Sequence, residues 1–272
     1  MRITLPLRNI LKPTSSGVGE ITSLTIELGN IRGESTSAQA WRLRKMILEA
    51  HNDPSKIIAH ACSYDGLSSR LVEEAGFPVV FLIRYTEVVR GVKVPVMADG
   101  DTGYGSPINI KRTVESFAVA GAAGIMIKDQ AWPKGCGRTK GKSVVSRSEA
   151  YARIQAAVDA RNEGQDIFIL ARTDALIHGW DEALTRAKEF KRIGVDAVFV
   201  EALPDRESMQ RCGKTEDLSA KDVAELGFCA VAYPWTLVAA KLKICKGVGF
   251  NRNWERLTRY EFNQDGLVNP PK

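Results

Sequence analysis

Short apolar runs alternate with amphipathic stretches along most of this chain. The runs are rich in Val, Ile and Phe and are too short for helices, so they predict β-strands. Seven strands are expected, at residues 56–63, 78–82, 94–99, 123–129, 166–174, 196–203 and 228–234. Between them, a helical period predicts helices at residues 68–75, 107–120, 147–162, 180–193, 219–226 and 235–243.

The first 40 residues have no sustained apolar period, and the regular pattern begins only at the stretch AWRLRKMILEAH. We therefore predict a flexible N-terminal tail over residues 1–40. A single catalytic domain, residues 41–272, follows it and ends in a helical tail. Two helices inside this domain have clear start signals. Ser106 precedes Pro107, and Ser146 precedes a helix with Glu149 as capping-box partner and Gly164 at its exit.

Alternating strands and helices predict an α/β fold with a parallel sheet, because parallel strands need crossover connections. Charged residues follow four consecutive strands: Asp99 and Asp101, Lys128 and Asp129, Arg172 and Asp174, and Glu201. A TIM-type (β/α)8 barrel collects all strand ends in one rim, whereas an open sheet gathers such residues at a single switch point. We therefore predict a (β/α)8 barrel with seven recognisable strands. The eighth should lie within residues 204–218, where no apolar run occurs.

Composition agrees with an ordinary globular protein, with 44% hydrophobic and 26% charged residues. No apolar stretch approaches the length of a membrane span. The net charge is +6, but Lys and Arg are spread through the helical stretches and no nucleic-acid-binding motif occurs. We expect neither a nucleic-acid nor a membrane partner. A mildly basic surface suits an enzyme that attracts small carboxylates.

The cysteines and the N-terminus bear on the compartment. Five cysteines without a CxxC pair indicate reduced thiols and a cytoplasmic protein. The leader has basic and hydroxyl residues and no acid before Glu20, which keeps a mitochondrial location open as an alternative. Cys62 and Cys229 lie in apolar runs and are expected in the core.

The stretch DGDTGYG, residues 99–105, follows a predicted strand. Residues two apart on a strand face the same side, so Asp99 and Asp101 would repel unless a cation or protons lie between them. Carboxylate oxygens suit Mg²⁺ or Mn²⁺, and glycines at 100, 103 and 105 would let a substrate approach the backbone. The alternative is a loop in which the aspartates only cap the next helix.

Two further strand ends carry residues for carboxylate chemistry. Arg172 could bind a substrate carboxylate through two parallel hydrogen bonds, or could form a structural ion pair with a nearby acid. Glu201 follows a fully apolar run and should face an arginine, a metal or a substrate, because an unpartnered buried carboxylate is costly.

The loop PKGCGRTKGK places Cys136 among basic residues and glycines. Positive charge lowers a thiol pKa and favours the thiolate. A mobile cationic loop over a barrel mouth suits closure on an anionic substrate, and its cysteine could act as an acid or base toward an enolate. An inert surface thiol is the alternative.

Together these motifs resemble the isocitrate lyase/phosphoenolpyruvate mutase superfamily. The segments DGDTGYG, DQ-x-x-PK-x-CG-x-x-x-GK, ARTDA and VEAL occur in the family's order, and the resemblance runs from about residue 50 to the end. The cysteine loop is similar to the lyase branch, with methylisocitrate lyase, dimethylmalate lyase and oxaloacetate hydrolase, rather than to the phosphonomutases.

The resemblance implies a barrel that assembles as a dimer or tetramer and holds Mg²⁺ or Mn²⁺ at Asp99 and Asp101. The metal would chelate a 2-oxo or 2-hydroxy carboxylate and stabilise an enolate, which the Cys136 thiol would protonate. The implied catalytic residues are Cys136, Arg172 and Glu201. The implied substrate-binding residues are Asp99, Lys134, Gly137, Arg138, Arg172 and Glu201.

The chain also departs from the family pattern. Lys128 stands where the family has an acid, and a cation there opposes metal binding; Arg138 stands where the family has a histidine. Segments are contracted between Leu82 and Ile83, after Arg211, and near residues 242–250. The first contraction would remove a substrate loop, and the second a strand of the barrel.

These observations predict a lyase or hydrolase that cleaves a carbon–carbon bond in a small 2-oxo or 2-hydroxy di- or tricarboxylic acid. Two alternatives lie in the same superfamily: a catalytically impaired member and a phosphonomutase-like enzyme. A basic nucleic-acid-binding protein is the alternative from another class. The identity of the substrate stays open.

Overall fold

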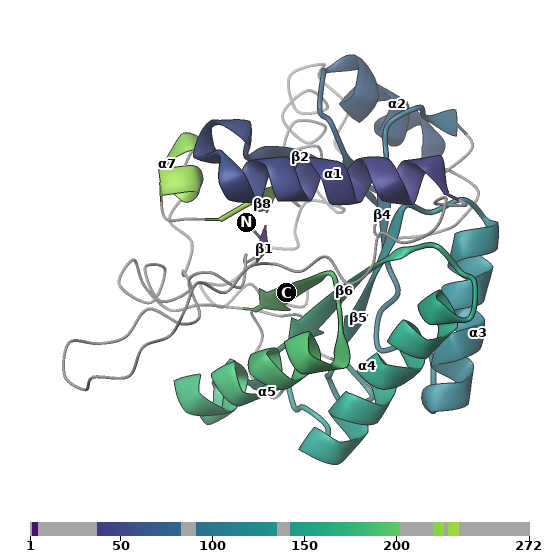
Figure 1. Cartoon of the computed structure of the whole chain (residues 1–272), viewed down its shortest axis with the longest axis vertical. Helices are drawn as coiled ribbons and strands as arrows, with labels where there is room; N and C mark the ends of the chain where they lie inside the picture. The colour runs from purple at the N-terminus through teal and green to yellow at the C-terminus, as the bar shows by residue number, and fades with distance from the viewer. Residues whose placement is uncertain are drawn as a thin grey trace, which may run out of the picture.

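The computed structural model describes residues 2–4, 37–82, 91–134, 142–201, 220–225 and 228–233. Its centre is one curved sheet in which seven parallel strands follow the order β8-β2-β3-β4-β5-β6-β7 (Figure 1). The parallel strands are β2 (Ile58–Ser63), β3 (Val80–Leu82), β4 (Val96–Asp99), β5 (Gly124–Lys128), β6 (Phe168–Thr173), β7 (Ala197–Val200) and β8 (Ala230–Tyr233). All seven strands predicted from the sequence are confirmed, and so is the α/β barrel class.

A short strand at the N-terminus was not predicted. β1 (Arg2–Thr4) pairs antiparallel with β8, with Ile3 opposite Val231. It lies within the stretch that we predicted as a tail, of which the structure describes only residues 2–4 and 37–40. The extent of the tail and of the catalytic domain stays a prediction, and the expected position of the eighth barrel strand lies outside the described residues.

Helices cover the sheet on its outer face and close it at one end. They are α1 (Ala38–Asn52), α2 (Gly66–Glu74), α3 (Pro107–Val119), α4 (Arg147–Asn162), α5 (Trp180–Ile193) and α7 (Ala220–Glu225), with short 3-10 turns η2 (Pro54–Lys56) and η4 (Ala175–His178). In Figure 1, α3, α4 and α5 flank β5 and β6, and α1 crosses the opposite end of the sheet. The helix predicted at residues 235–243 lies outside the described residues.

The start of α4 is only partly as predicted. The Ser146 hydroxyl accepts a hydrogen bond from the Glu149 amide at 3.2 Å, as an N-cap should. The Glu149 carboxylate instead pairs with Arg153, one turn further along the helix. Gly164 follows the helix with a φ of +118°, a conformation that favours glycine.

Alternation along the strands creates two apolar layers. In β5, Ile125 and Ile127 pack outward under the helices, whereas Met126 packs inward. The inward layer includes Leu43 and Ala50 of α1, so α1 closes the barrel interior. Cys62 and Cys229 are buried in this layer, which confirms their expected place in the core.

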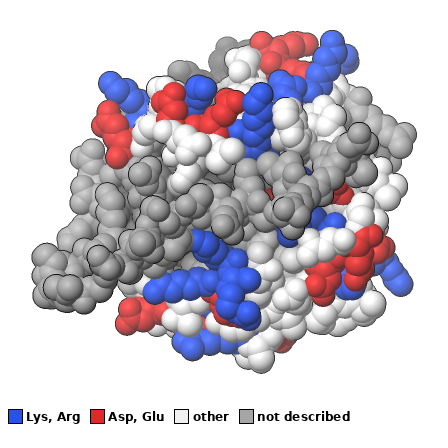
Figure 2. Space-filling view, in the orientation of Figure 1, with Lys and Arg blue, Asp and Glu red and all other residues white. Residues whose placement is uncertain are grey.

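Charge of both signs is interspersed over the face shown in Figure 2, with acidic groups among the Lys and Arg side chains. Among the described helices, none is long and apolar enough to cross a membrane.

Candidate functional site

Four neighbouring strands direct charged side chains into the same end of the barrel. Met97, Met126, Leu170 and Phe199 all belong to the inward layer. Side chains two residues apart share a face, so the residues two positions later also turn inward. These are Asp99 on β4, Lys128 on β5, Arg172 on β6 and Glu201 just after β7. These four side chains therefore gather at the carboxyl end of the strands, and we call this group the rim.

Asp99 and Lys128 form a buried ion pair at the rim. The Lys128 Nζ lies 2.9 Å from Asp99 Oδ2, and the two side chains are 5% and 7% exposed. The other carboxylate oxygen, Oδ1, accepts a hydrogen bond from the Asp101 amide at 3.0 Å. Both oxygens of Asp99 are thus engaged by the protein itself. Burial lowers the pKa of Lys128, and Arg172 and Lys134 lower it further, although Asp99 and Asp101 act in the opposite direction.

Asp101 lies two residues further on, where the chain turns out of β4. Its backbone has a φ of +55°, and its carbonyl accepts a 2.8 Å hydrogen bond from the Lys128 amide. One carboxylate oxygen pairs with the Lys134 ammonium. The other, Oδ1, is buried and has no hydrogen-bond partner among the described residues.

Arg172 is held in a fixed orientation by two acids. Its Nε and Nη2 donate to Asp174 at 2.9 and 3.1 Å, and its Nη1 lies 3.4 Å from Glu201 Oε2. Burial disfavours the charge on Arg172, but Glu201 and Asp174 outweigh that cost and raise its pKa. Glu201 therefore faces an arginine, as the sequence indicated. Within the described chain, neither Arg172 Nη1 nor Glu201 Oε2 has a hydrogen bond of good geometry.

The two ends of the cysteine loop are fixed to this rim. The Ala131 amide donates to the Ser143 carbonyl, and the Val145 amide donates to the main-chain carbonyl of Asp129, both at 2.9 Å. The Lys142 Nζ, at the far end, lies 3.0 Å from Asp174 Oδ1. Burial opposes the charge on Asp174, but Arg172 and Lys142 together lower its pKa to about 2.

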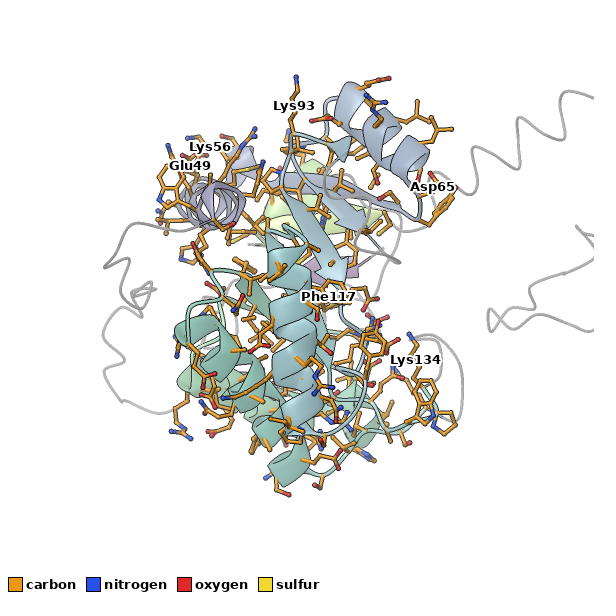
Figure 3. The ribbon with its side chains drawn as sticks, turned by 90° about the vertical axis from the view of Figure 1, so that its right-hand side faces the viewer. Glu49, Lys56, Asp65, Lys93, Phe117 and Lys134 are labelled. Atoms are coloured by element: carbon orange, nitrogen blue, oxygen red, sulfur yellow. The ribbon has the colours of Figure 1, made fainter. Side chains whose placement is uncertain are left out.

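Three predicted site residues cannot be placed. Cys136, Gly137 and Arg138 fall within residues 135–141, outside the described part of the chain. Lys134, directly before this segment, is described, and in Figure 3 it lies on the same side as Asp65, which follows the end of β2.

Asp129 was noticed in the sequence as a strand-end acid, but its partners make it a structural residue. It accepts hydrogen bonds from Thr173 Oγ1 at 2.6 Å and from the Asp174 amide at 2.9 Å, and it pairs with Arg186 of α5 at 3.1 Å. Burial raises its pKa, although the bonds from Thr173 and Asp174 oppose the shift. It fixes the ends of β5 and β6 to each other and to α5.

The glycines of DGDTGYG serve packing in this structure. A Cβ on Gly103, where φ is +83°, would lie 2.2 Å from Ile110 Cγ1. A Cβ on Gly100 would lie 2.7 Å from Ile125. Close approach of the chain to its own core therefore accounts for these two positions without a substrate.

The predicted metal site does not fit the side chains present. Each of five carboxylates near the rim is already within ion-pair distance of a Lys or Arg: Asp99 with Lys128, Asp101 with Lys134, Asp129 with Arg186, Asp174 with Arg172 and Lys142, and Glu201 with Arg172. The five acids thus face five cations and leave no excess negative charge for a divalent ion. Over the described ranges, no group of three or more His, Cys, Asp or Glu side chains could hold a metal.

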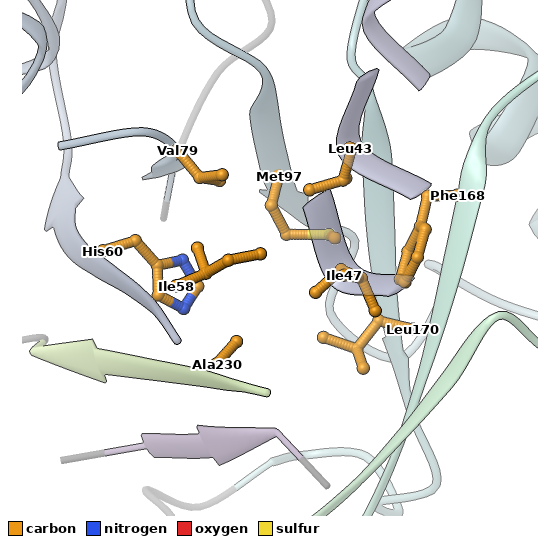
Figure 4. Close-up of a pocket in the computed structure, with 9 residues that line it drawn as sticks. All are labelled: Leu43, Ile47, Ile58, His60, Val79, Met97, Phe168, Leu170 and Ala230. Atoms are coloured by element: carbon orange, nitrogen blue, oxygen red, sulfur yellow. The ribbon is translucent and has the colours of Figure 1, made fainter. Parts of the chain in front are cut away.

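A small cavity lies elsewhere in the barrel, near the start of the strands. It has a volume of about 20 Å³ and is lined by Leu43, Ile47, Ile58, His60, Val79, Met97, Phe168, Leu170 and Ala230 (Figure 4). Only His60 is polar among them. Burial lowers the pKa of His60 to about 4. This space is large enough for about one water molecule and is no substrate site.

Comparison with known proteins finds one family model and several relatives that cover most of the chain. The family model described as phosphoenolpyruvate phosphomutase matches residues 81–246. The petal death protein of Dianthus caryophyllus is 33% identical over 250 residues, which cover 74% of this chain and 78% of that protein. A probable 2-methylisocitrate lyase of Corynebacterium glutamicum is 34% identical over 245 residues, 76% of this chain and 80% of that enzyme.

Two solved structures are also similar to this chain. The structure of a 2,3-dimethylmalate lyase superposes with a TM-score of 0.69 at 30% identity and covers 81% of this chain and 85% of that one. An oxaloacetate acetylhydrolase bound to 3,3-difluorooxalacetate also superposes with a TM-score of 0.69, at 27% identity over 86% of this chain and 89% of that one.

Proposed function

Because this chain belongs to the phosphoenolpyruvate mutase/isocitrate lyase superfamily, we propose that it cleaves a carbon–carbon bond in a small 2-oxo or 2-hydroxy di- or tricarboxylic acid. Relatives named 2-methylisocitrate lyase and 2,3-dimethylmalate lyase support this substrate class. The substrate is of the methylisocitrate, dimethylmalate or oxaloacetate type. A homo-oligomer and a cytoplasmic location belong to the proposal as well.

The observation that supports the proposal most strongly is the state of Arg172. Asp174 holds two nitrogens of its guanidinium in a fixed plane, while among the described residues Nη1 has only the 3.4 Å contact with Glu201. A buried guanidinium with one open donor at the carboxyl end of a barrel is a binding position for a substrate carboxylate. Its orientation is fixed before substrate arrives, which reduces the entropy cost of binding.

The chain's own residues suffice for a cleavage step on a 2-hydroxy acid. A base removes the hydroxyl proton, the hydroxyl carbon becomes a carbonyl, and the electron pair of the broken bond passes to the departing fragment as an enolate. Glu201 Oε2, which has no hydrogen-bonded donor among the described residues, accepts that proton. Lys128, Lys134 and Arg172 supply positive charge near the enolate oxygen. The Cys136 thiol protonates the enolate carbon.

The test is an activity and binding assay on the full chain. Oxaloacetate, 2-methylisocitrate and 2,3-dimethylmalate are supplied separately, and oxalate, pyruvate and succinate are quantified. We expect turnover of one of these acids. Arg172→Lys keeps the charge but loses the planar fork, so the KM should rise about tenfold or more. Cys136→Ser should abolish turnover while oxalate, used as a probe, still binds.

A second candidate is a catalytically impaired member of the family, which the Asp99–Lys128 pair favours. The same assay distinguishes an impaired member from an active enzyme. In an impaired member, oxalate binds to the wild type and its binding is lost in Arg172→Lys, but none of the three acids is consumed. Failure of both turnover and oxalate binding would contradict the proposed function in either form.

A further inference from the structure

We propose that Lys128 takes the place of a divalent cation at the rim, so that this chain binds its anionic substrate without a metal. Only the identity of that substrate rests on the proposed function. The exclusion of metal is a separate property of the side chains and has its own test.

Both carboxylate oxygens of Asp99 already accept hydrogen bonds from the protein itself. Lys128 Nζ occupies Oδ2 at 2.9 Å, and the Asp101 amide occupies Oδ1 at 3.0 Å. A metal ion at Oδ2 would meet the buried ammonium of Lys128, and one at Oδ1 would compete with the amide that begins the turn. A divalent cation needs a local excess of negative charge beside its oxygen ligands, and Lys128 removes that excess at Asp99.

Lys128 is held firmly in its place. It lies on a central strand, paired in register with Arg172 of β6, and its amide donates to the Asp101 carbonyl at 2.8 Å. The residue is 4% exposed, so its ammonium cannot simply rotate into solvent. A cation built into a strand does not dissociate and cannot be removed by a chelator.

The same arrangement leaves positions for an anionic ligand. Arg172 Nη1 has no hydrogen-bond acceptor among the described residues. Lys134, at the margin of the rim, keeps its side chain 38% exposed while it pairs with Asp101. Lys128, paired in register with Arg172, completes a group of three cations. The chemical class that fits is a small dicarboxylate, with one carboxylate on Arg172 and the developing oxyanion near the lysines.

The test is a titration of the substrate-free protein with Mn²⁺, followed by the electron paramagnetic resonance signal of the unbound ion. Five proteins are compared: the wild type, Lys128→Met, Asp99→Asn, the double variant that combines Lys128→Met with Asp99→Asn, and Lys188→Met. Lys188 is exposed on α5 and serves as the matched control for loss of one positive charge. Circular dichroism checks the fold, and Lys128→Gln replaces Lys128→Met if the latter does not fold.

We expect the wild type and Lys188→Met to leave Mn²⁺ unbound at millimolar concentration. Lys128→Met should bind one Mn²⁺ at least about tenfold more tightly than the wild type, because Asp99 and Asp101 Oδ1 become available together. The double variant should lose that site. Tight Mn²⁺ binding to the wild type that Asp99→Asn abolishes would overturn the proposal, and so would a Lys128 variant that folds but binds no better. Neither result depends on whether the protein turns over or binds a carboxylate.

Discussion

Acidification should destabilise this protein through His60, and the size of the effect follows from the structure. The ring is buried in the barrel interior beside Phe81, with ring centroids 5.4 Å apart, and neither ring nitrogen has a hydrogen-bond partner in the described chain. Burial lowers its pKa from the ordinary 6.5 to about 4. The folded state therefore disfavours the protonated ring.

Proton linkage decides whether acid stabilises or destabilises the fold. Between pH 6.5 and pH 4 the unfolded chain binds a proton at this position and the folded chain does not, so stability falls as the pH is lowered. A shift of one pKa unit corresponds to about 1.4 kcal/mol, which gives a loss of about 2 kcal/mol between pH 7 and pH 5. The full loss, reached below pH 4, is about 3 kcal/mol.

The assay is urea unfolding of the wild type and His60→Leu at pH 7 and pH 5. Leucine keeps the apolar surroundings and removes the titrating group, so the variant should lose about 2 kcal/mol less than the wild type over this range. Other groups that titrate contribute equally to both proteins and cancel in the difference. Equal losses in the two proteins would refute the account of a buried, neutral His60.

Two further substitutions test the supports of the rim. Asp129→Asn should lower the free energy of unfolding by roughly 2 kcal/mol, because Arg186 loses its buried charge partner at the strand end and keeps only Glu182 as a carboxylate contact among the described residues. The exposed Asp181→Asn should change the free energy of unfolding by less than about 0.5 kcal/mol in the same urea titration. Gly103→Ala should cost about 3 kcal/mol, since its Cβ would lie 2.2 Å from Ile110 in a strained backbone. Gly164→Ala shares the positive φ but has open space around it, so a cost of only about 1 kcal/mol is expected, and equal costs would contradict the packing argument.

Much of the fold could be predicted because local pattern and tertiary burial agree. Strands such as β5 and β6 are buried along their whole length, so their runs of Ile, Leu and Phe stand out in the sequence. β1 could not be found in this way. It has three residues, and its pairing depends on the distant β8 rather than on a pattern of its own.

The sequence predicted which residues lie at the candidate site but not which of them form ion pairs with one another. Sequence spacing correctly placed Asp99, Lys128, Arg172 and Glu201 at the ends of neighbouring strands. Whether Asp99 meets a metal or Lys128 depends on the register between β4 and β5, in which Asp99 lies opposite Met126, and on the rotamer of a long lysine side chain. No local signal in the sequence encodes either.

The role of Asp129 shows the same limit. A strand-end aspartate in a row of strand-end charges looks like part of the site. Its partner Arg186 lies 57 residues later on α5, so only the packed structure reveals that it joins strand to helix. The glycines of DGDTGYG were likewise attributed to substrate approach, whereas Gly100 and Gly103 are explained by Ile125 and Ile110 of the core.

The central claim is that Arg172 binds the substrate carboxylate while Lys128 excludes a metal from Asp99. One measurement addresses both parts: a crystal structure of the full chain grown with oxalate and Mn²⁺, with diffraction data collected at the manganese absorption edge. We predict oxalate within hydrogen-bond distance of Arg172 Nη1 and no anomalous peak beside Asp99 or Asp101. A manganese peak bonded to Asp99, with the Lys128 ammonium displaced, would contradict the account.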